Sequence, residues 1–89
     1  MLKQLRLAKE LELKRQELKK LEEREATIQQ RSADFQQSIE EVESDDDLKL
    51  LDEEIEKLEG ETQEVTEAKT SIQEEVEKLE NDLSELNER

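Results

Sequence analysis

The stretch Val42-Glu43-Ser44-Asp45-Asp46-Asp47-Leu48 decides the fold, because it separates two runs of apolar residues that are out of phase. On either side of it, apolar side chains recur at alternating spacings of three and four residues, the heptad pattern of a coiled-coil helix. Continuing the first pattern through the stretch would place Lys49 on the apolar face, whereas the apolar residues are Leu48 and Leu51. Coiled coils absorb shifts of three or four residues, not two. The sequence therefore predicts two helices joined by a short turn.

The same stretch contains a signal for the start of a helix. Ser44 can act as an N-cap by accepting a hydrogen bond from the backbone N–H of Asp47. The carboxylates of Asp45, Asp46 and Asp47 would then lie at the positive end of the helix dipole. A calcium-binding loop is the alternative for so acidic a run, but the glycine that such a loop needs at its sharp turn is missing. We therefore expect a capped turn and no metal.

The two runs define the expected helices and their core. We expect a first helix over residues 2–42, a turn over 43–46 and a second helix over 46–88, forming one coiled-coil domain over 1–89. The apolar positions on the two seams, which we expect to form the helix–helix core, are Leu7, Leu11, Leu18, Leu21, Ile28, Phe35, Ile39, Val42, Leu48, Leu51, Ile55, Leu58, Val65, Ile72, Val76, Leu79, Leu83 and Leu86.

An antiparallel pairing of the two helices brings these positions into register. If facing residues have numbers that add up to 90, Leu11 faces Leu79, and no layer is polar on both sides. Glu25 and Lys69 then lie in adjacent layers, close enough for an ion pair. In a parallel homodimer Glu25 would instead face its own copy, at a cost of about 1 kcal/mol or more. The sequence therefore predicts an all-α fold, an antiparallel helical hairpin in the form of a two-helix coiled coil.

The composition excludes most kinds of enzyme. Of the 89 residues, 47% are charged and 1% are aromatic, and Cys, His, Trp and Tyr are absent. The chain therefore lacks the thiolate and imidazole groups that most nucleophilic catalysis and many metal sites require, and it has little material to line a pocket. We expect no enzymatic activity and no cofactor. Because no apolar run exceeds two residues, we also expect no membrane-spanning segment and no signal peptide.

The net charge of −14 is distributed unevenly along the chain. Residues 1–42 contain nine basic and nine acidic residues, whereas residues 43–89 contain five basic and nineteen acidic residues. Nucleic acid is not expected as a partner, because binding to phosphates requires clustered Lys and Arg. The hairpin would place residues 1–24, with a net charge of +3, beside residues 64–89, with a net charge of −6. This charge difference also favours the antiparallel arrangement.

A seam of two positions in seven is narrow, so we expect the hairpin to associate further into larger bundles. Leu2, Leu5 and Leu13 lie off the seam and give the N-terminal end a second apolar face. They are the candidate residues for self-association. Lys3, Arg6 and Lys9 beside these leucines would suit a membrane-surface helix as well. Three basic residues are few, however, and they serve helix pairing equally well, so we expect no membrane contact.

Four stretches of the chain together resemble one known family. They are Met1-Leu2-Lys3-Gln4-Leu5-Arg6-Leu7-Ala8-Lys9-Glu10-Leu11, the Lys/Arg/Glu-rich helix that follows with Arg31 to Phe35, the acidic joint Glu43-Ser44-Asp45-Asp46-Asp47-Leu48-Lys49, and the ending Leu83-Ser84-Glu85-Leu86-Asn87. They look like the N-terminal delta domain of major capsid proteins from tailed bacteriophages with the Hong Kong ninety-seven fold. The likeness covers essentially the whole chain, and the capsid shell domain is not present in it.

This resemblance implies an internal scaffolding function. Delta domains guide capsid assembly through weak helical contacts and are removed by proteolysis before DNA is packaged. The implied partners are further copies of the chain, capsid subunits and a maturation protease. The implied location is the host bacterial cytoplasm, inside the immature capsid, with the segment absent from the mature virion. The residues alone leave another interpretation open, namely a coiled-coil spacer or adaptor hairpin of a larger bacterial protein.

Overall fold

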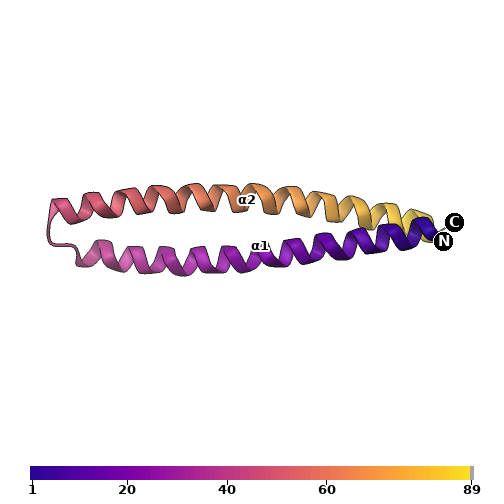
Figure 1. Cartoon of the computed structure of the whole chain (residues 1–89), viewed down its shortest axis with the longest axis horizontal. Coiled ribbons are helices and arrows are strands. Elements are labelled where there is room, and N and C mark those ends of the chain that lie inside the picture. The colour runs from indigo at the N-terminus through magenta and orange to yellow at the C-terminus, as the bar shows by residue number, and fades with distance from the viewer. Residues whose placement is uncertain (89) are drawn as a thin grey trace.

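The computed structural model describes residues 1–88, which form two long helices connected by a short turn (Figure 1). Helix α1 spans Leu2–Glu41 and helix α2 spans Asp45–Asn87. The helices run antiparallel, so that α1 begins and α2 ends at one end of the molecule, with the turn at the other (Figure 1). The rod measures 67 × 15 × 15 Å, close to the length of 40 helical residues. The predicted all-α helical hairpin is confirmed.

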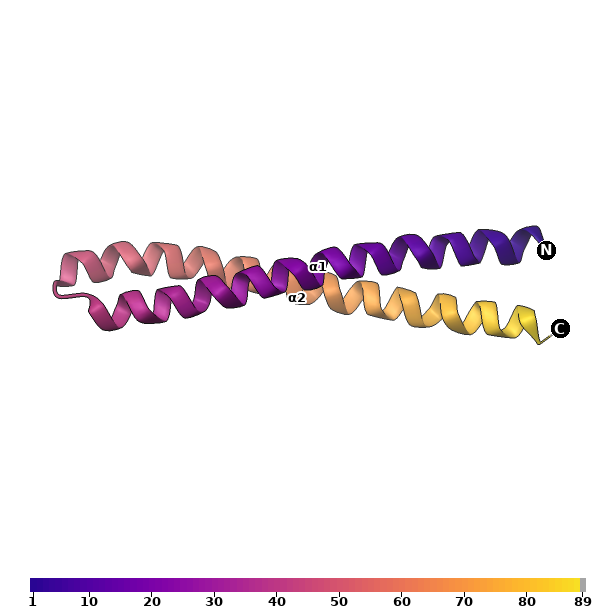
Figure 2. The ribbon, with the colours of Figure 1, turned by 90° about the horizontal axis from the view of Figure 1, so that it is seen from below.

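The two helices wind around each other along the rod. When the molecule is turned by 90°, the ribbons cross near its middle (Figure 2). A heptad repeat causes such winding, because its spacing of 3.5 residues per turn falls short of the 3.6 residues per turn of a straight helix. The supercoil keeps the apolar seam of each helix facing its partner.

The turn is shorter than the predicted range 43–46, because only three residues, 42–44, separate the helices. Val42 ends α1 with an extended backbone, at φ −66° and ψ 133°. Ser44 is also extended and its side chain accepts a hydrogen bond from the backbone N–H of Asp47 at 3.2 Å. This is the expected N-cap, and α2 begins one residue earlier than predicted, with Asp45, Asp46 and Asp47 in its first turn. At the far end α2 stops at Asn87, one residue before the expected end.

The core consists of two clusters. The cluster near the chain ends contains Leu7, Leu11, Val76 and Leu79, with Ile72, Leu83 and Leu86 packed against it. The second cluster contains Ile28, Leu58 and Val65, with Phe35 packed against it. Four further predicted core residues are partly buried, Leu18 and Leu21 between the clusters and Leu51 and Ile55 towards the turn, as is Val42. The charged seam residues Lys14, Glu25 and Lys69 lie between the two clusters in sequence, and they account for the division.

Two of the predicted core residues lie outside the core. Ile39 is 41% exposed and Leu48 is 38% exposed. Both belong to the last layers before the turn, and only residues 40–47 lie beyond them. A layer at the end of a coil is covered on one side only, so a side chain with the correct heptad phase still contacts water there. The apolar core therefore ends before the turn.

Candidate interaction surfaces

An ion pair between the helices lies within the seam. The ammonium group of Lys69 donates to both carboxylate oxygens of Glu25, at 3.1 and 3.3 Å. This is the ion pair expected from the antiparallel register. The two side chains are only partly exposed, and Val65, the most buried residue of the core, precedes Lys69 by one helical turn. The pair lets two charged seam residues occupy the interface without leaving either charge unpartnered.

The outer edges of the interface carry further ion pairs that sequence analysis did not single out. In three of them a basic residue of α1 meets a glutamate of α2, namely Lys14 with Glu75 at 3.0 Å, Arg15 with Glu80 at 3.3 Å and Arg31 with Glu61 at 2.9 Å. Exposed pairs of this kind contribute about 0–1 kcal/mol each. They therefore determine the antiparallel orientation of the two helices more than they stabilise the hairpin. For the Lys14 and Arg15 pairs, the signal available in the sequence was the opposite net charge of residues 1–24 and residues 64–89; Arg31 and Glu61 lie outside these two segments.

The open end of the hairpin is tied together by Gln4. Its side-chain amide donates to the backbone carbonyl of Leu86 at 3.3 Å and to the side-chain oxygen of Asn87 at 3.2 Å. These contacts join the first turn of α1 to the last turn of α2. Gln4 occupies the heptad position one turn before Leu7, and this spacing was the signal that sequence analysis left unused.

The pKa of Lys14 is raised, so the stability of the hairpin depends on pH in the alkaline range. The hydrogen bond to Glu75 is the main cause that raises the pKa of Lys14 above 10.5, and the charges of Glu17, Glu75 and Glu10 act in the same direction. A lysine whose pKa is raised by folding stabilises the fold below its unfolded pKa. That contribution is lost as pH rises through the folded pKa.

We therefore expect Lys14→Gln to lower the melting temperature at neutral pH and up to about pH 10, and to have less effect above the ordinary lysine pKa of 10.5. The measurement is thermal unfolding by circular dichroism at several pH values, with the two melting temperatures subtracted at each pH. Lys19→Gln is the matched control, since Lys19 is exposed and forms no ion pair within residues 1–88. A Lys14→Gln difference that stays constant across this range would contradict the assigned role of the Glu75 contact.

The N-terminal stripe, which we define as Leu2, Leu5 and Leu13, is exposed to solvent. Leu2 is 83% exposed, Leu5 is 64% exposed and Leu13 is 48% exposed. Spacings of three and eleven residues from Leu2 correspond to about one and three helical turns, so the three leucines share one face of α1. Leu7 and Leu11 lie on the opposite face, within the core. The structure thus brings the predicted self-association residues together on a surface that the hairpin itself does not cover.

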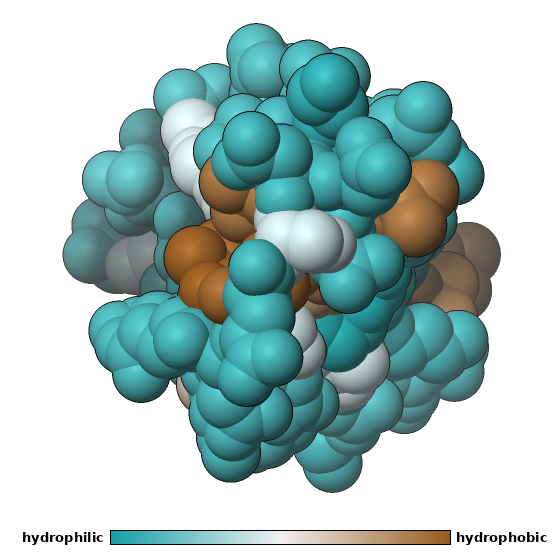
Figure 3. Space-filling view, turned by 90° about the vertical axis from the view of Figure 1, so that its left-hand side faces the viewer, coloured by the Kyte–Doolittle hydropathy of each residue, from teal (hydrophilic) through white to brown (hydrophobic). Residues whose placement is uncertain are grey.

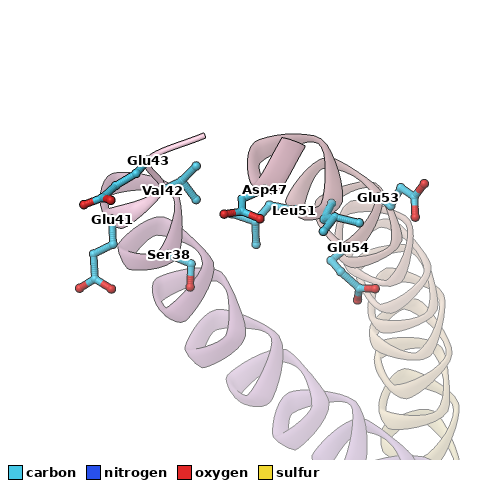
Figure 4. Close-up of a pocket in the computed structure, with 9 residues that line it drawn as sticks. Ser38, Glu41, Val42, Glu43, Asp47, Leu51, Glu53 and Glu54 are labelled. Carbon is cyan, nitrogen blue, oxygen red and sulfur yellow. The ribbon is translucent and has the colours of Figure 1, made fainter. Parts of the chain in front are cut away.

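A groove lies at the turn, between the end of α1 and the start of α2 (Figure 4). Its apolar lining residues are Val42, Leu50 and Leu51. Its polar lining residues are Ser38, Glu41, Glu43, Asp47, Glu53 and Glu54. Viewed from the turn, the molecule shows apolar atoms surrounded by hydrophilic ones (Figure 3). We call this feature the turn groove.

Leu50 is the residue of the turn groove that sequence analysis missed. It is 66% exposed and lies off the seam, between Lys49 and the seam residue Leu51. The sequence feature that could have identified Leu50 is the one that identified Leu2 and Leu5, because all three are apolar residues outside the heptad pattern. The turn end therefore presents apolar surface beyond what the core requires.

The described part of the chain offers no metal site or membrane span. Within residues 1–88, no three Asp or Glu side chains are grouped so that they could hold a metal ion. Over the same residues, neither helix has a segment apolar enough to cross a membrane. Comparisons with protein-family models, with curated proteins and with solved structures gave no match.

Proposed function

We propose that this chain is a non-enzymatic helical hairpin that associates with copies of itself, and that it is the internal scaffolding segment of a phage major capsid protein. In this role it guides assembly of the immature capsid through weak helical contacts, and proteolysis removes it before DNA packaging. The observation that carries the proposal is the exposed N-terminal stripe on a rod that is otherwise mostly charged. Exposed leucines on a face opposite the core serve contacts with another molecule better than they serve the fold.

The size of this surface suits reversible assembly. Burying one leucine contributes about 2 kcal/mol, so a contact made by two or three of them is weak on its own. Weak contacts allow wrongly placed subunits to dissociate. The same contacts become effective when they are repeated many times in one assembly.

The charge of the chain supports removal before DNA enters. The net charge is −14, and residues 43–89 account for all of it. A dense array of carboxylates repels the phosphates of DNA, most strongly at low salt. A segment with this charge would oppose packaging if it remained inside the shell. The proposed partners are therefore capsid subunits, other copies of the hairpin and a maturation protease, inside an immature capsid in the bacterial host.

The proposal is tested by expressing the complete reading frame that contains this chain, with and without residues 1–89. We expect the complete product to form closed shells of uniform size and the shortened product to form few or irregular shells, as seen by electron microscopy. Replacing residues 1–89 by an unrelated helical hairpin of equal length is the control for the loss of bulk. A shortened product that assembles normally would contradict the scaffolding function.

A coiled-coil spacer or adaptor in a larger bacterial protein is the second candidate. The supporting observation is the 67 Å rod, which holds the turn far from the end where α1 starts and α2 finishes. A reading frame with no shell-forming domain would favour this function over scaffolding. Such a spacer would tolerate insertion of whole heptads into both helices, whereas a scaffold that sets shell geometry would not.

A further inference from the structure

The turn end of the rod and the N-terminal segment of α1 at the opposite end carry opposite charges. At the turn end, residues 40–54 contain nine acidic residues and one basic residue. At the other end, residues 1–9 of α1 contain three basic residues and no acidic residue, while residues 80–88 of α2 beside them contain four acidic residues and no basic one. Both ends also expose leucines that the hairpin core does not use, Leu50 at the turn and Leu2 with Leu5 at the start of α1. The turn end and residues 1–9 thus each combine apolar side chains with charges opposite to those of the other.

The turn groove has the features of an acceptor for an apolar and basic segment. Its apolar lining is formed by Val42, Leu50 and Leu51, and its rim bears five carboxylates, from Glu41, Glu43, Asp47, Glu53 and Glu54. In Figure 4 the carboxylate of Asp47 lies between the two helix ends, whereas those of Glu41 and Glu43 on one side and of Glu53 on the other point outward from the groove. A ligand with leucines in its middle and positive charges at its edges would match this arrangement.

The N-terminal segment of α1 has that chemistry. Leu2 and Leu5 are one helical turn apart, and Arg6 and Lys9 lie beside them on the same side of the helix. The first turn of α1 contains no acidic residue, and Met1 makes no side-chain cap. The positive end of this helix dipole therefore lacks a negative partner within its own first turn, and carboxylates from another molecule would be favourable there.

We propose that the turn groove of one copy binds the N-terminal segment of a second copy, so that hairpins associate end to end. The inference rests on the proposed self-associating function and names the surface that the N-terminal stripe contacts. Because the two contacting surfaces differ and lie at opposite ends of each rod, the association is head to tail. Such contacts build open chains, or rings where the rotation closes. Two identical N-terminal stripes would instead give only a closed dimer and would bring like positive charges together.

The test uses two double variants of the complete 89-residue chain, measured by analytical ultracentrifugation over a range of concentrations. The stripe variant carries Leu2→Glu and Leu5→Glu, and the groove variant carries Leu50→Gln and Glu54→Gln, so the two altered surfaces are not oppositely charged. We expect wild type to form oligomers whose mass grows with concentration and falls with added salt, because exposed charges are screened beyond about 10 Å at 0.1 M. Each variant alone should associate at least about tenfold more weakly. All four positions are exposed, so the helical circular dichroism should be retained.

Mixing the two variants distinguishes the possible contacts. The stripe variant keeps an intact groove and the groove variant keeps an intact stripe, so an equimolar mixture should form one-to-one dimers and no longer chains. Gln16→Glu with Gln29→Glu, which adds the same charge as the stripe variant at exposed positions, should associate as wild type does. If the groove variant associates normally by itself, stripe contacts stripe, which overturns head-to-tail binding and leaves scaffolding intact. A wild-type chain that stays monomeric at all concentrations also overturns the inference, while shell formation by the complete reading frame decides the function separately.

Discussion

Replacing Val65 by Asp is expected to unfold the hairpin at room temperature. Val65 is the most buried residue, with 1% of its surface exposed, and it belongs to the core cluster with Ile28 and Leu58. Lys69, one turn further on in α2, is already paired with Glu25. A second carboxylate there would compete for that ammonium group and leave one charge uncompensated, at a cost of several kcal/mol. A chain of 89 residues has a total stability of about 4 to 13 kcal/mol.

The measurement is far-ultraviolet circular dichroism with a urea titration of wild type and variant. Thr66→Asp is the matched control, because it adds the same charge to the neighbouring, exposed position and should change stability by less than about 0.5 kcal/mol. If Val65→Asp keeps its helicity and its urea midpoint, the centre of the hairpin is not packed as the structure shows.

Cysteines at positions 11 and 79 are expected to form a disulfide within one chain. Leu11 and Leu79 are buried in the same core cluster, although 68 positions separate them in the sequence. A bond between them closes a loop of most of the chain, which in the entropy model stabilises the folded state by about 4 kcal/mol relative to the reduced form. For a domain of this size that corresponds to a melting temperature about 20 °C higher in the oxidised protein. Non-reducing gels and thermal unfolding measure the two effects.

The control pairs the cysteine at 79 with one at 13. Leu13 lies on the exposed face of α1, so this pair cannot meet within a chain and should cross-link only between molecules at high concentration. The hairpin register would be wrong if the 11/79 pair behaved in the same way, or if the disulfide within one chain lowered the melting temperature.

The heptad phase was sufficient to predict the hairpin because it reports which face of each helix is apolar. The Glu25–Lys69 ion pair followed from the same register, since a constant sum of residue numbers places the two side chains in adjacent layers. The capping hydroxyl of Ser44 was also predictable, because an N-cap depends on a local sequence of four residues. All of these features are determined by residues that are close in sequence or related by a simple repeat.

Features that depend on the exact path of the chain were not predictable in this way. Ser32 and Thr62 each follow a core residue by four positions, Ile28 and Leu58, and so have the heptad phase of the interface, yet both are exposed, and Arg31 and Glu61 pair beside them. Small polar side chains gain little from burial, so nothing holds them on the seam where the supercoil drifts from an ideal repeat. The Thr62 hydroxyl donates instead to the backbone carbonyl of Leu58 in its own helix, at 2.8 Å.

The exposed surfaces were predictable only in part. Leu2, Leu5 and Leu13 were identified because they are apolar residues off the seam. The turn groove was missed because its shape depends on how three residues connect the helices, and periodicity carries no information about a non-repeating connection. The function was not determined by any motif, because a chain rich in Glu, Lys and Leu contains no catalytic or ligand-binding pattern to recognise.

The position of the chain ends gives the hairpin a defined response to mechanical force. Since α1 begins and α2 ends at the same end of the rod, pulling on these two ends peels the helices apart from that end (Figure 1). The contacts of Gln4 with Leu86 and Asn87 would break first, the cluster around Leu11 next and the layers near the turn last. Only one layer bears the load at a time, so the hairpin should open at much lower force than a pair of helices pulled in shear. The two helices would therefore separate layer by layer under tension.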